Sequence, residues 1–599
     1  MSRLPLPSIP WQLTGNHWLA IPCVHPGDGA IHRLGVLHRG ARAALEFTGA
    51  GTGDARDGAP LLRPVLSVDG QPARLGESGM AWERALGWLP TFTCTVGPLL
   101  VRGMLFCPFG RDADMAGAVY TLTIENRGTV PRAVSLGLAV EPGVLVPRVR
   151  SPRAPIGRLG ATRHESLVVL DPGTVPGLAA LAVGADGASV VALDGAGGAS
   201  VTCERTLRPG EREEVAFYVA AGPEADGAVA TSAAMRRRGW RWLLTATREA
   251  IETLQQATGS ESLDRLLNRN LLFAYFYGVG RALDDAHFYL VRSRAPWHPA
   301  GVTLRDWDAL MMTLPAVQLA DTGLARELLL RMCELHGYAP GRGVHYLDGT
   351  MFEPAYSLDG VAAYAVALER YIRQTNDDHL IDDPVVGDTL YAVHDELADR
   401  RHAELPLYAT EVAPSGEVPP HPYTLHGNAM AAFALEVLRR TLDEETAREV
   451  QDPEAVRAAI DRSFARADGG KKTYRTALDL SGGEASADDA VGSAAWLPLY
   501  EVVRGDDSTY RRTVRALGDA PVASLAAMLA RLLGPDRTAV LEWLRRAPLD
   551  GGVAAQWVDA DGRAVANGGD AALAGLVAAT VLHVVGREGG ATSEGDDAP

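Results

Sequence analysis

The sequence predicts two structural classes in succession, an antiparallel β-sandwich followed by a ring of α-helices. Up to about residue 225, short apolar runs such as 116–124 and 189–193 alternate with clusters of Gly, Asn and Pro, as is typical of strands joined by turns. From Thr231 onward, apolar residues recur at helical spacing, and about a dozen helical segments follow to Arg587. A double ring of helix pairs is the commonest closed arrangement for so many helices.

The same change of pattern gives the expected domain boundaries. A long helical segment follows the β region directly and indicates a linker, and the last residues are small, polar and acidic, which predicts disorder. The expected parts are a β-sandwich domain at 1–225, a helical linker at 226–260, a helical domain at 261–587 and a disordered tail at 588–599.

Two local patterns add detail to this organisation. Pro209-Gly210 stands between two strand-like runs, which predicts a β-hairpin. The segments 309–319 and 571–585 carry few charges on any face, so we expect helices that are buried on most sides.

Composition limits the class of partner. The 57 basic and 74 acidic residues give a net charge of −17, which argues against nucleic acid or an anionic membrane surface and favours a small uncharged or cationic ligand. The five cysteines are scattered without CxxC spacing, so neither a zinc site nor a disulfide scaffold is indicated. No signal-peptide pattern occurs, and no window reaches the roughly 18 to 20 apolar residues that span a bilayer. We expect a cytoplasmic protein without a metal or cofactor.

One stretch, 405–440, joins a polar loop to a helix. The loop carries Glu411 and Glu417 among several Pro and Gly residues, which places these side chains on an irregular surface segment. From Ala429 to Leu438, apolar residues return at helical spacing. A carboxylate loop at the rim of a helix suggests acid catalysis, whereas the simpler interpretation is a loop with solvated glutamates.

A second stretch, 297–319, combines aromatic and charged residues. Trp297 precedes Arg305, Asp306 and Trp307 at the start of a predicted helix. An Asp there can simply cap the helix. The same residue types also suit a sugar pocket, because charged groups bind hydroxyls and indole rings stack on the apolar face of a pyranose.

Several of these segments, in this order, resemble the glucoamylase-like inverting glycoside hydrolases of the bacterial type, which are related to amylo-α-1,6-glucosidase debranching enzymes. Leu304-Arg305-Asp306 resembles their pocket motif, and 348–370 resembles their third-to-fourth helix region. The segment 416–424 resembles the one that ends in their general acid, and 556–562 (QWVDADG) resembles their general-base loop. The resemblance implies an N-terminal β-sandwich of the supersandwich kind, a helical linker and a C-terminal (α/α)6 barrel.

The resemblance also implies a catalytic pair. An inverting glycosidase needs a protonated carboxyl and an ionised one, about 6.5 to 9.5 Å apart. Glu417 matches the acid, but Ala555 stands where the family has its base. Asp550, Asp559 or Asp561 could replace the base; otherwise the nucleophile needs none, or the reaction is not hydrolysis.

The expected function is inverting, exo-type hydrolysis of α-glucosides or short oligosaccharides. A phosphorylase or other transferase on the same scaffold, and a carbohydrate-binding or regulatory barrel without a base, remain as alternatives. His421 and His426 are expected to hydrogen-bond loop backbone rather than a metal. The candidate sugar-binding residues are Trp297, Arg305, Asp306, Trp307, Glu353, Tyr356, Glu411, His421, Tyr423, Gln556 and Trp557.

Overall fold

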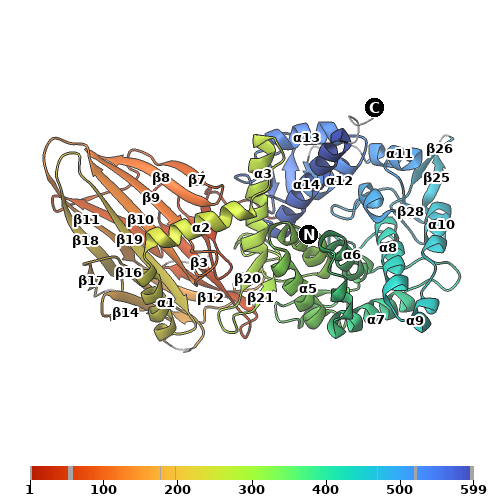
Figure 1. Ribbon diagram of the computed structural model, residues 1–599, viewed down its shortest axis with the longest axis horizontal. Helices are drawn as coiled ribbons and strands as arrows, with labels where there is room; N and C mark the ends of the chain where they lie inside the picture. The colour runs from red at the N-terminus through yellow and green to blue at the C-terminus, as the bar shows by residue number, and fades with distance from the viewer. Residues whose placement is uncertain are drawn as a thin grey trace.

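The structure, a computed structural model, describes residues 3–50, 59–173, 175, 177–195, 197–468, 470–517 and 522–593. Its described part begins with antiparallel β structure and ends in helices, so the prediction of a β region followed by a helical region is confirmed. Figure 1 shows the two regions side by side, joined by α1 (Ala225–Arg238) and α2 (Trp240–Leu254). The helical conformation is interrupted at Gly239, where a φ of 78° ends α1 and separates it from α2.

The described part of the β region forms two large sheets, and every pairing between their named strands is antiparallel. The larger sheet comprises β1 (Gln12–Gly15), β2 (Leu19–Val24), β3 (Ile31–His38), β4 (Ala43–Gly49), β5 (Leu62–Val68), β6 (Gln71–Ala73), β11 (Arg132–Val140), β12 (Pro142–Arg148), β13 (Gly157–Arg158), β17 (Val190–Leu193) and β18 (Ala199–Leu207). The smaller sheet comprises β7 (Ala81–Ala85), β8 (Leu89–Val96), β9 (Leu99–Phe106), β10 (Gly117–Asn126), β14 (Gly160–His164), β15 (Leu167–Asp171), β16 (Ala180–Ala185) and β19 (Arg212–Gly222).

The two sheets share one hydrophobic core. Leu34 and Leu136 of the larger sheet belong to the same buried cluster as Leu122 and Phe217 of the smaller sheet. Since alternate side chains of a strand point to opposite faces, each sheet contributes one apolar face to this cluster.

The predicted hairpin at Pro209-Gly210 is wrong. β18 pairs with β11 and β17 in the larger sheet, whereas β19 lies between β10 and β16 in the smaller one. The turn thus carries the chain from one sheet to the other. Asn126 stabilises it, because its side-chain amide donates to the Leu207 carbonyl and its backbone carbonyl accepts from the Gly210 amide. A turn between two apolar runs indicates two strands, but it does not reveal which neighbours those strands pair with.

Six helical segments of the C-terminal region contact one another in a closed cycle, and we call them the ring helices. The sequence prediction of buried helices at 309–319 and 571–585 is confirmed for most of their residues, which belong to this ring. In chain order the ring helices are η2 (Asp308–Thr313) with α4 (Leu314–Ala320), α6 (Leu358–Thr375), α8 (Leu425–Thr441), η4 (Ala494–Tyr500), α12 (Leu525–Ala530) with η5 (Arg531–Leu533), and α14 (Ala571–Ser593).

Six further helices each pack against a ring helix, and short elements connect them. The six are α3 (Glu261–Phe273), α5 (Thr322–His336), α7 (Pro384–Asp399), α10 (Pro453–Phe464), α11 (Ser508–Ala516) and α13 (Arg537–Arg546). The connecting elements are η1 (Ala274–Gly278), β20 (Val279–Arg281), β21 (Phe288–Leu290), β22 (Val344–His345), β23 (Met351–Glu353), η3 (Asp378–Asp382), β24 (Tyr423–Thr424), α9 (Glu444–Glu449), β25 (Ala465–Asp468), β26 (Lys471–Tyr474), β27 (Ala477–Leu478), β28 (Glu484–Ala485), β29 (Val522–Ser524), β30 (Trp557–Asp559) and β31 (Ala564–Ala566).

Both ends of the chain lie against the helical region. The Leu4 amide donates to Asn567 Oδ1 at 2.8 Å, and the Asn567 amide donates to the Leu4 carbonyl at 2.9 Å. α14 continues to Ser593, six residues into the predicted tail, and the remainder of that tail lies outside the described residues. No helix in the described ranges is both long enough and apolar enough to cross a membrane.

Candidate functional site

A cleft of about 300 Å³ lies at the N-terminal ends of two ring helices, η2 and α6. Its walls come from three stretches of the chain: residues 305–307 just before η2, the segment from Gly341 to the first turn of α6, and the loop before α8. The lining residues are Arg305, Asp306, Trp307, Gly341, Gly343, Val344, Glu353, Pro354, Ala355, Ser357, Gly360, Val412, Ala413, Pro414 and Gly416. Four of the predicted sugar-binding residues are therefore brought together.

Arg305 and Asp306 have separate partners in the cleft wall. Arg305 makes two parallel hydrogen bonds to Asp308, from Nε and Nη2, each of 2.9 Å. Asp306 is fully buried and accepts from the Gly341 amide at 2.7 Å and from the Tyr364 hydroxyl at 3.0 Å. Burial raises the pKa of Asp306 to about 7, and the two donors only partly oppose this rise.

The loop that carries Glu417 is folded directly against Arg305. Gly416 has a φ of 82°, and a Cβ atom at this position would lie 2.5 Å from Arg305 Nη1. The Ala413 amide donates to the Glu417 carbonyl at 2.9 Å and closes the turn, while Asp489 accepts from the Ser415 amide. Glu417 is exposed and immediately follows the cleft-lining Gly416.

Trp307 and His426 connect the cleft to a buried polar network. The Trp307 ring meets the His426 ring edge-on, with centroids 5.2 Å apart. His426 Nδ1 is 2.5 Å from Asp359 Oδ1, and its Nε2 is 3.1 Å from the Tyr500 hydroxyl. The prediction that His426 hydrogen-bonds loop backbone is therefore wrong, because α6, α8 and η4 bring three polar side chains together in the core. Trp307 Nε1 is buried and has no hydrogen-bond partner among the described residues.

A second buried network was missed by sequence reasoning. Arg292 pairs with Asp308 at the start of η2 and with Asp570 before α14, and His298 lies 3.4 Å from Asp570. Burial alone would lower the pKa of Arg292, but the two carboxylates raise it. Burial alone would raise the pKa of Asp570. The nearby Arg292 and His298 lower this pKa instead, the charge of Arg292 most strongly. In the sequence, only the acidic residues at the starts of η2 and α14, Asp308 and Asp570, hint at this network.

Several predicted site residues support the loop instead of lining the cleft. Tyr356 is buried and donates its amide to Glu411 at 3.0 Å, and Glu411 also accepts from Arg400. Arg400 lies over the Tyr356 ring at 4.1 Å from its centroid.

Glu353 lines the cleft at its exposed rim, where it accepts from Arg150 of the β region.

The loop residues His421 and Tyr423 are both half-buried. Tyr423 forms β24, which pairs with β27, and its ring contacts His402. A Cβ atom at Gly483 would lie 2.7 Å from the His421 ring, so these two residues pack against the β27–β28 turn rather than line the cleft.

The three candidate bases differ in their surroundings. Asp559 accepts two amide hydrogen bonds within the turn between β30 and β31, and Asp561 in that turn pairs with Arg563. Asp550 is half-buried in a separate cavity of about 90 Å³ that Trp297 also lines. Burial raises the pKa of Asp550, and Arg269 partly opposes this.

The predicted base loop contacts the N-terminal residues of the chain. Ala555 is completely buried. The next residue, Gln556, is also buried and accepts a 2.7 Å hydrogen bond from Asn567, while the half-buried Trp557 stacks under Arg3 at 4.3 Å. None of these three residues lines the cleft.

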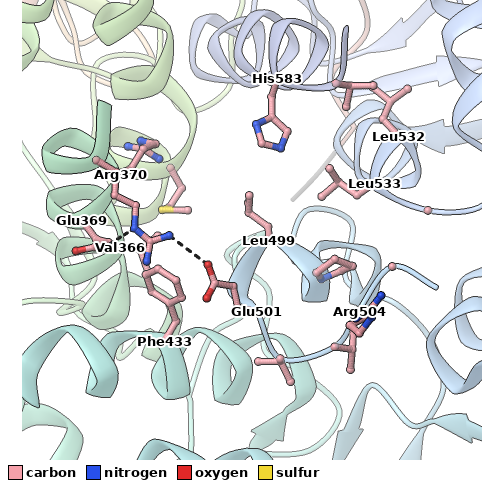
Figure 2. A pocket seen from close by; sticks show the side chains of 18 of the residues that line it. Val366, Glu369, Arg370, Phe433, Leu499, Glu501, Arg504, Leu532, Leu533 and His583 are labelled. Atoms are coloured by element: carbon pink, nitrogen blue, oxygen red, sulfur yellow. Dashed lines mark hydrogen bonds and ion pairs between the residues drawn. The ribbon is translucent and has the colours of Figure 1, made fainter. Parts of the chain in front are cut away.

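A larger cavity of about 850 Å³ lies at the other, C-terminal ends of the ring helices, and Figure 2 shows it. His583 points into it from α14, and Leu499 enters from η4. Some of its charged groups pair with one another: Arg373 bonds Glu369 and Glu501, and Arg504 bonds Asp506. Arg370 instead donates to the Leu310 carbonyl, and its buried Nε has no partner among the described residues. No predicted site residue lies in this cavity.

Comparison with known proteins identifies the fold. No protein-family model and no curated protein matches the sequence. A bacterial glucoamylase complexed with acarbose matches with a TM-score of 0.59 and 10% identity, over 98% of this chain and 96% of that one. A protein from the human microbiome assigned as a kojibiose phosphorylase matches with a TM-score of 0.58 and 10% identity, over 95% of this chain and 86% of that one. The glucoamylase-like resemblance predicted from the sequence is thus confirmed for the fold.

Proposed function

We propose that this protein is a carbohydrate-active enzyme that cleaves α-glucosides or short oligosaccharides from one end. Its ring helices and the helices around them correspond, in this proposal, to an (α/α)6 barrel behind a β-sandwich. The observation that carries the proposal is the cleft in which Arg305, Asp306 and Trp307 converge at the N-terminal ends of η2 and α6. A volume of about 300 Å³ is at the small end of ligand pockets, which suits one terminal sugar.

The lining offers the groups that a sugar needs. Arg305 and Asp306 would bind hydroxyls, and the Trp307 ring provides an apolar face. The buried Trp307 Nε1 has no partner among the described residues, so a ligand hydroxyl would satisfy it. Arg305 is already oriented by its two bonds to Asp308, which reduces the entropy lost when a ligand binds.

Glu417 is the proposed general acid. Its loop is folded against Arg305 at Gly416, which lines the cleft, so the proposal has the exposed Glu417 side chain reach a sugar bound there. A sugar in the cleft would shield it from water, and desolvation raises a carboxyl pKa toward the range that an acid catalyst requires.

The general base is the unusual part of this proposal. Ala555 has no titratable group, and the turn hydrogen bonds and the ion pair to Arg563 already engage Asp559 and Asp561. Asp550 is the remaining candidate, but burial favours its protonated form, whereas a base must be ionised. These surroundings favour a second candidate function, transfer to phosphate or to another sugar, because phosphate is a nucleophile that needs no deprotonation.

Product analysis with a panel of α-glucosides, each with and without phosphate, tests the proposal. Glu417→Gln should reduce turnover by about 10²- to 10⁴-fold, since it removes a general acid. Turnover of α-glucosyl fluoride should fall much less, because fluoride needs little protonation. Glu501→Gln, at the rim of the opposite cavity, is the matched control and should keep wild-type turnover.

The product pattern separates the alternatives. Hydrolysis that is lost in Asp550→Asn identifies that residue as the base, and the same test applies to Asp559→Asn and Asp561→Asn. Turnover only with phosphate or a second sugar indicates transfer. Sugar binding without turnover indicates a binding protein, and absence of sugar binding rejects the carbohydrate assignment.

A further inference from the structure

Three buried side chains beside the cleft form a cluster that the sequence did not suggest. Asp306, His336 and His345 each place one possible ligand atom so that these atoms lie within 4.8 Å of one another. Each residue is at most 2% exposed. Asp306 also lines the cleft, so the cluster lies directly behind its wall.

Three separate segments hold the cluster in place. His336 is the last residue of α5, and His345 belongs to β22. An antiparallel bridge joins His345 to Leu304, two residues before Asp306, through backbone hydrogen bonds of 2.8 and 3.0 Å. The two imidazole rings meet edge-on with centroids 4.7 Å apart. The bridge therefore sets the backbone of His345 beside that of the segment that carries Asp306, and the ring contact places His336 against His345.

The two histidines of the cluster leave hydrogen-bonding capacity unused within the described part of the chain. Nδ1 of His336 and Nδ1 of His345 are both buried and have no partner among the described residues. A buried polar atom without a partner costs about 1 to 3 kcal/mol, so two neighbouring examples point to a missing ligand. Asp306 accepts from Gly341 and Tyr364, but a carboxylate has about four acceptor sites and can bind more.

We propose that Asp306, His336 and His345 bind a first-row divalent metal ion, with Zn²⁺ favoured. Two imidazole nitrogens and one carboxylate oxygen form a donor set that suits Zn²⁺ and leaves a fourth position open. Bonds of about 2.0 to 2.1 Å place tetrahedral ligands roughly 3.3 Å apart, so the side chains would rotate inward on binding. Tyr364 and Gly341 would orient the carboxylate from the outer shell.

The ion would connect two parts of the molecule. It would fix the carboxyl of Asp306 in the cleft wall and tie the end of α5 to β22, which leads into β23 at the cleft rim. The metal site shares Asp306 with the proposed sugar site, but it is argued from the cluster alone, and its test measures bound metal and not activity.

Metal analysis of the full chain tests the proposal. The protein, with any affinity tag removed, is stripped with a chelator, dialysed against Zn²⁺ alone and then against metal-free buffer, and the bound zinc is measured by mass spectrometry. We expect about one Zn²⁺ per chain and a higher Tm than for the stripped protein, because an ion that binds only the folded state stabilises it. His336→Gln and His345→Gln should lose both the bound zinc and the rise in Tm.

His38→Gln is the matched control. His38 also has a buried ring nitrogen without a partner and lies 3.3 Å from Asp284, but it belongs to no such cluster in the described residues. This variant should keep its zinc. Less than one tenth of an ion per wild-type chain, or full zinc in both folded cluster variants, would overturn the proposal.

Co²⁺ bound to the wild-type chain gives a second test, which decides the question even where a variant fails to fold. Protein ligands at a four- or five-coordinate site produce strong visible absorption. The weak spectrum of aqueous Co²⁺ in the presence of the wild-type chain would contradict the proposal.

Discussion

The two ends of the ring of helices differ in charge and in burial. At the N-terminal ends, Asp308 and Asp570 are buried against Arg292, whereas at the C-terminal ends Arg373 lies at a rim where its side chain is 51% exposed. Carboxylates near helix N-termini and arginines near C-termini both complement the helix dipole. The difference lies in the desolvation of the ion pairs, because both partners of the N-terminal pairs are buried, whereas the pairs of Arg373 each have at least one partner that is about half exposed.

This comparison explains why the smaller cleft, and not the larger cavity, is the proposed site. The C-terminal cavity is larger, but each of its ion pairs has at least one side chain that is about half exposed or more, and such pairs contribute little. The N-terminal cleft is smaller and is lined by Trp307, whose buried Nε1 has no partner among the described residues. Groups of this kind are costly to leave without a partner, which supports the proposal that a ligand binds there.

The largest expected effect contrasts one arginine from each end. Arg292→Met removes the cation shared by the buried Asp308 and Asp570, which keep only Arg305 and His298 beside them, and should lower the free energy of unfolding by about 3 to 5 kcal/mol. Arg373→Met removes pairs of a half-exposed arginine, and Glu369 keeps its pair with Arg440, so this change should cost about 1 kcal/mol or less. Denaturant unfolding of both variants measures the difference. Equal losses would show that the two ends do not differ in desolvation.

A smaller effect concerns the pH dependence of stability. Burial raises the pKa of Asp488, before η4, to about 6, while Ser493 and the Ala494 amide donate to it. A raised carboxyl pKa stabilises the folded protein below the unfolded pKa of about 4, and this contribution is lost as the pH rises toward 6. Relative to Asp488→Asn, the wild type should therefore lose about 2 kcal/mol of unfolding free energy between pH 4 and 6. A difference that stays constant over this range would contradict the shifted pKa.

The smallest effect compares one glycine from each end. Gly416→Ala places a Cβ atom 2.5 Å from Arg305 Nη1 at a φ of 82° and should cost about 1 to 2 kcal/mol. It should also weaken sugar binding, because the Glu417 loop must move. Gly505→Ala, in the C-terminal cavity, meets no atom closer than 3.5 Å and should stay within about 0.5 kcal/mol of wild type. Thermal unfolding and sugar titration of both variants provide the measurement, and unchanged binding by Gly416→Ala would separate this loop from the site.

The sequence was sufficient where the information is local. Apolar spacing predicted most helices, including the buried 309–319, because a helix that is covered on most sides needs apolar residues around its whole circumference. It was less reliable at helix ends. Helical spacing predicts one helix over 443–465 and another over 508–533, but each is divided, the first at Pro453, which begins α10, and the second by β29.

The candidate site was only partly accessible from the sequence. Arg305, Asp306 and Trp307 are adjacent in the chain, so their chemistry could be predicted as one motif, and they do lie in one cleft. Trp297 belongs to the same stretch but lines a different cavity, because the chain turns between it and η2. Adjacency in sequence therefore predicted the motif and not its full extent.

The sequence by itself determined the order of a β region and a helical region, the buried character of the ring segments 309–319 and 571–585, and the Arg305-Asp306-Trp307 motif, since each depends on neighbouring residues. Only the tertiary structure decided that β18 and β19 lie in different sheets, that Arg292 joins Asp308 to Asp570, and that Asp306 meets two histidines. Strand pairing and buried polar networks join residues far apart in the chain. Their energy comes from long-range contacts that exclude water, and no local pattern records which residues will meet.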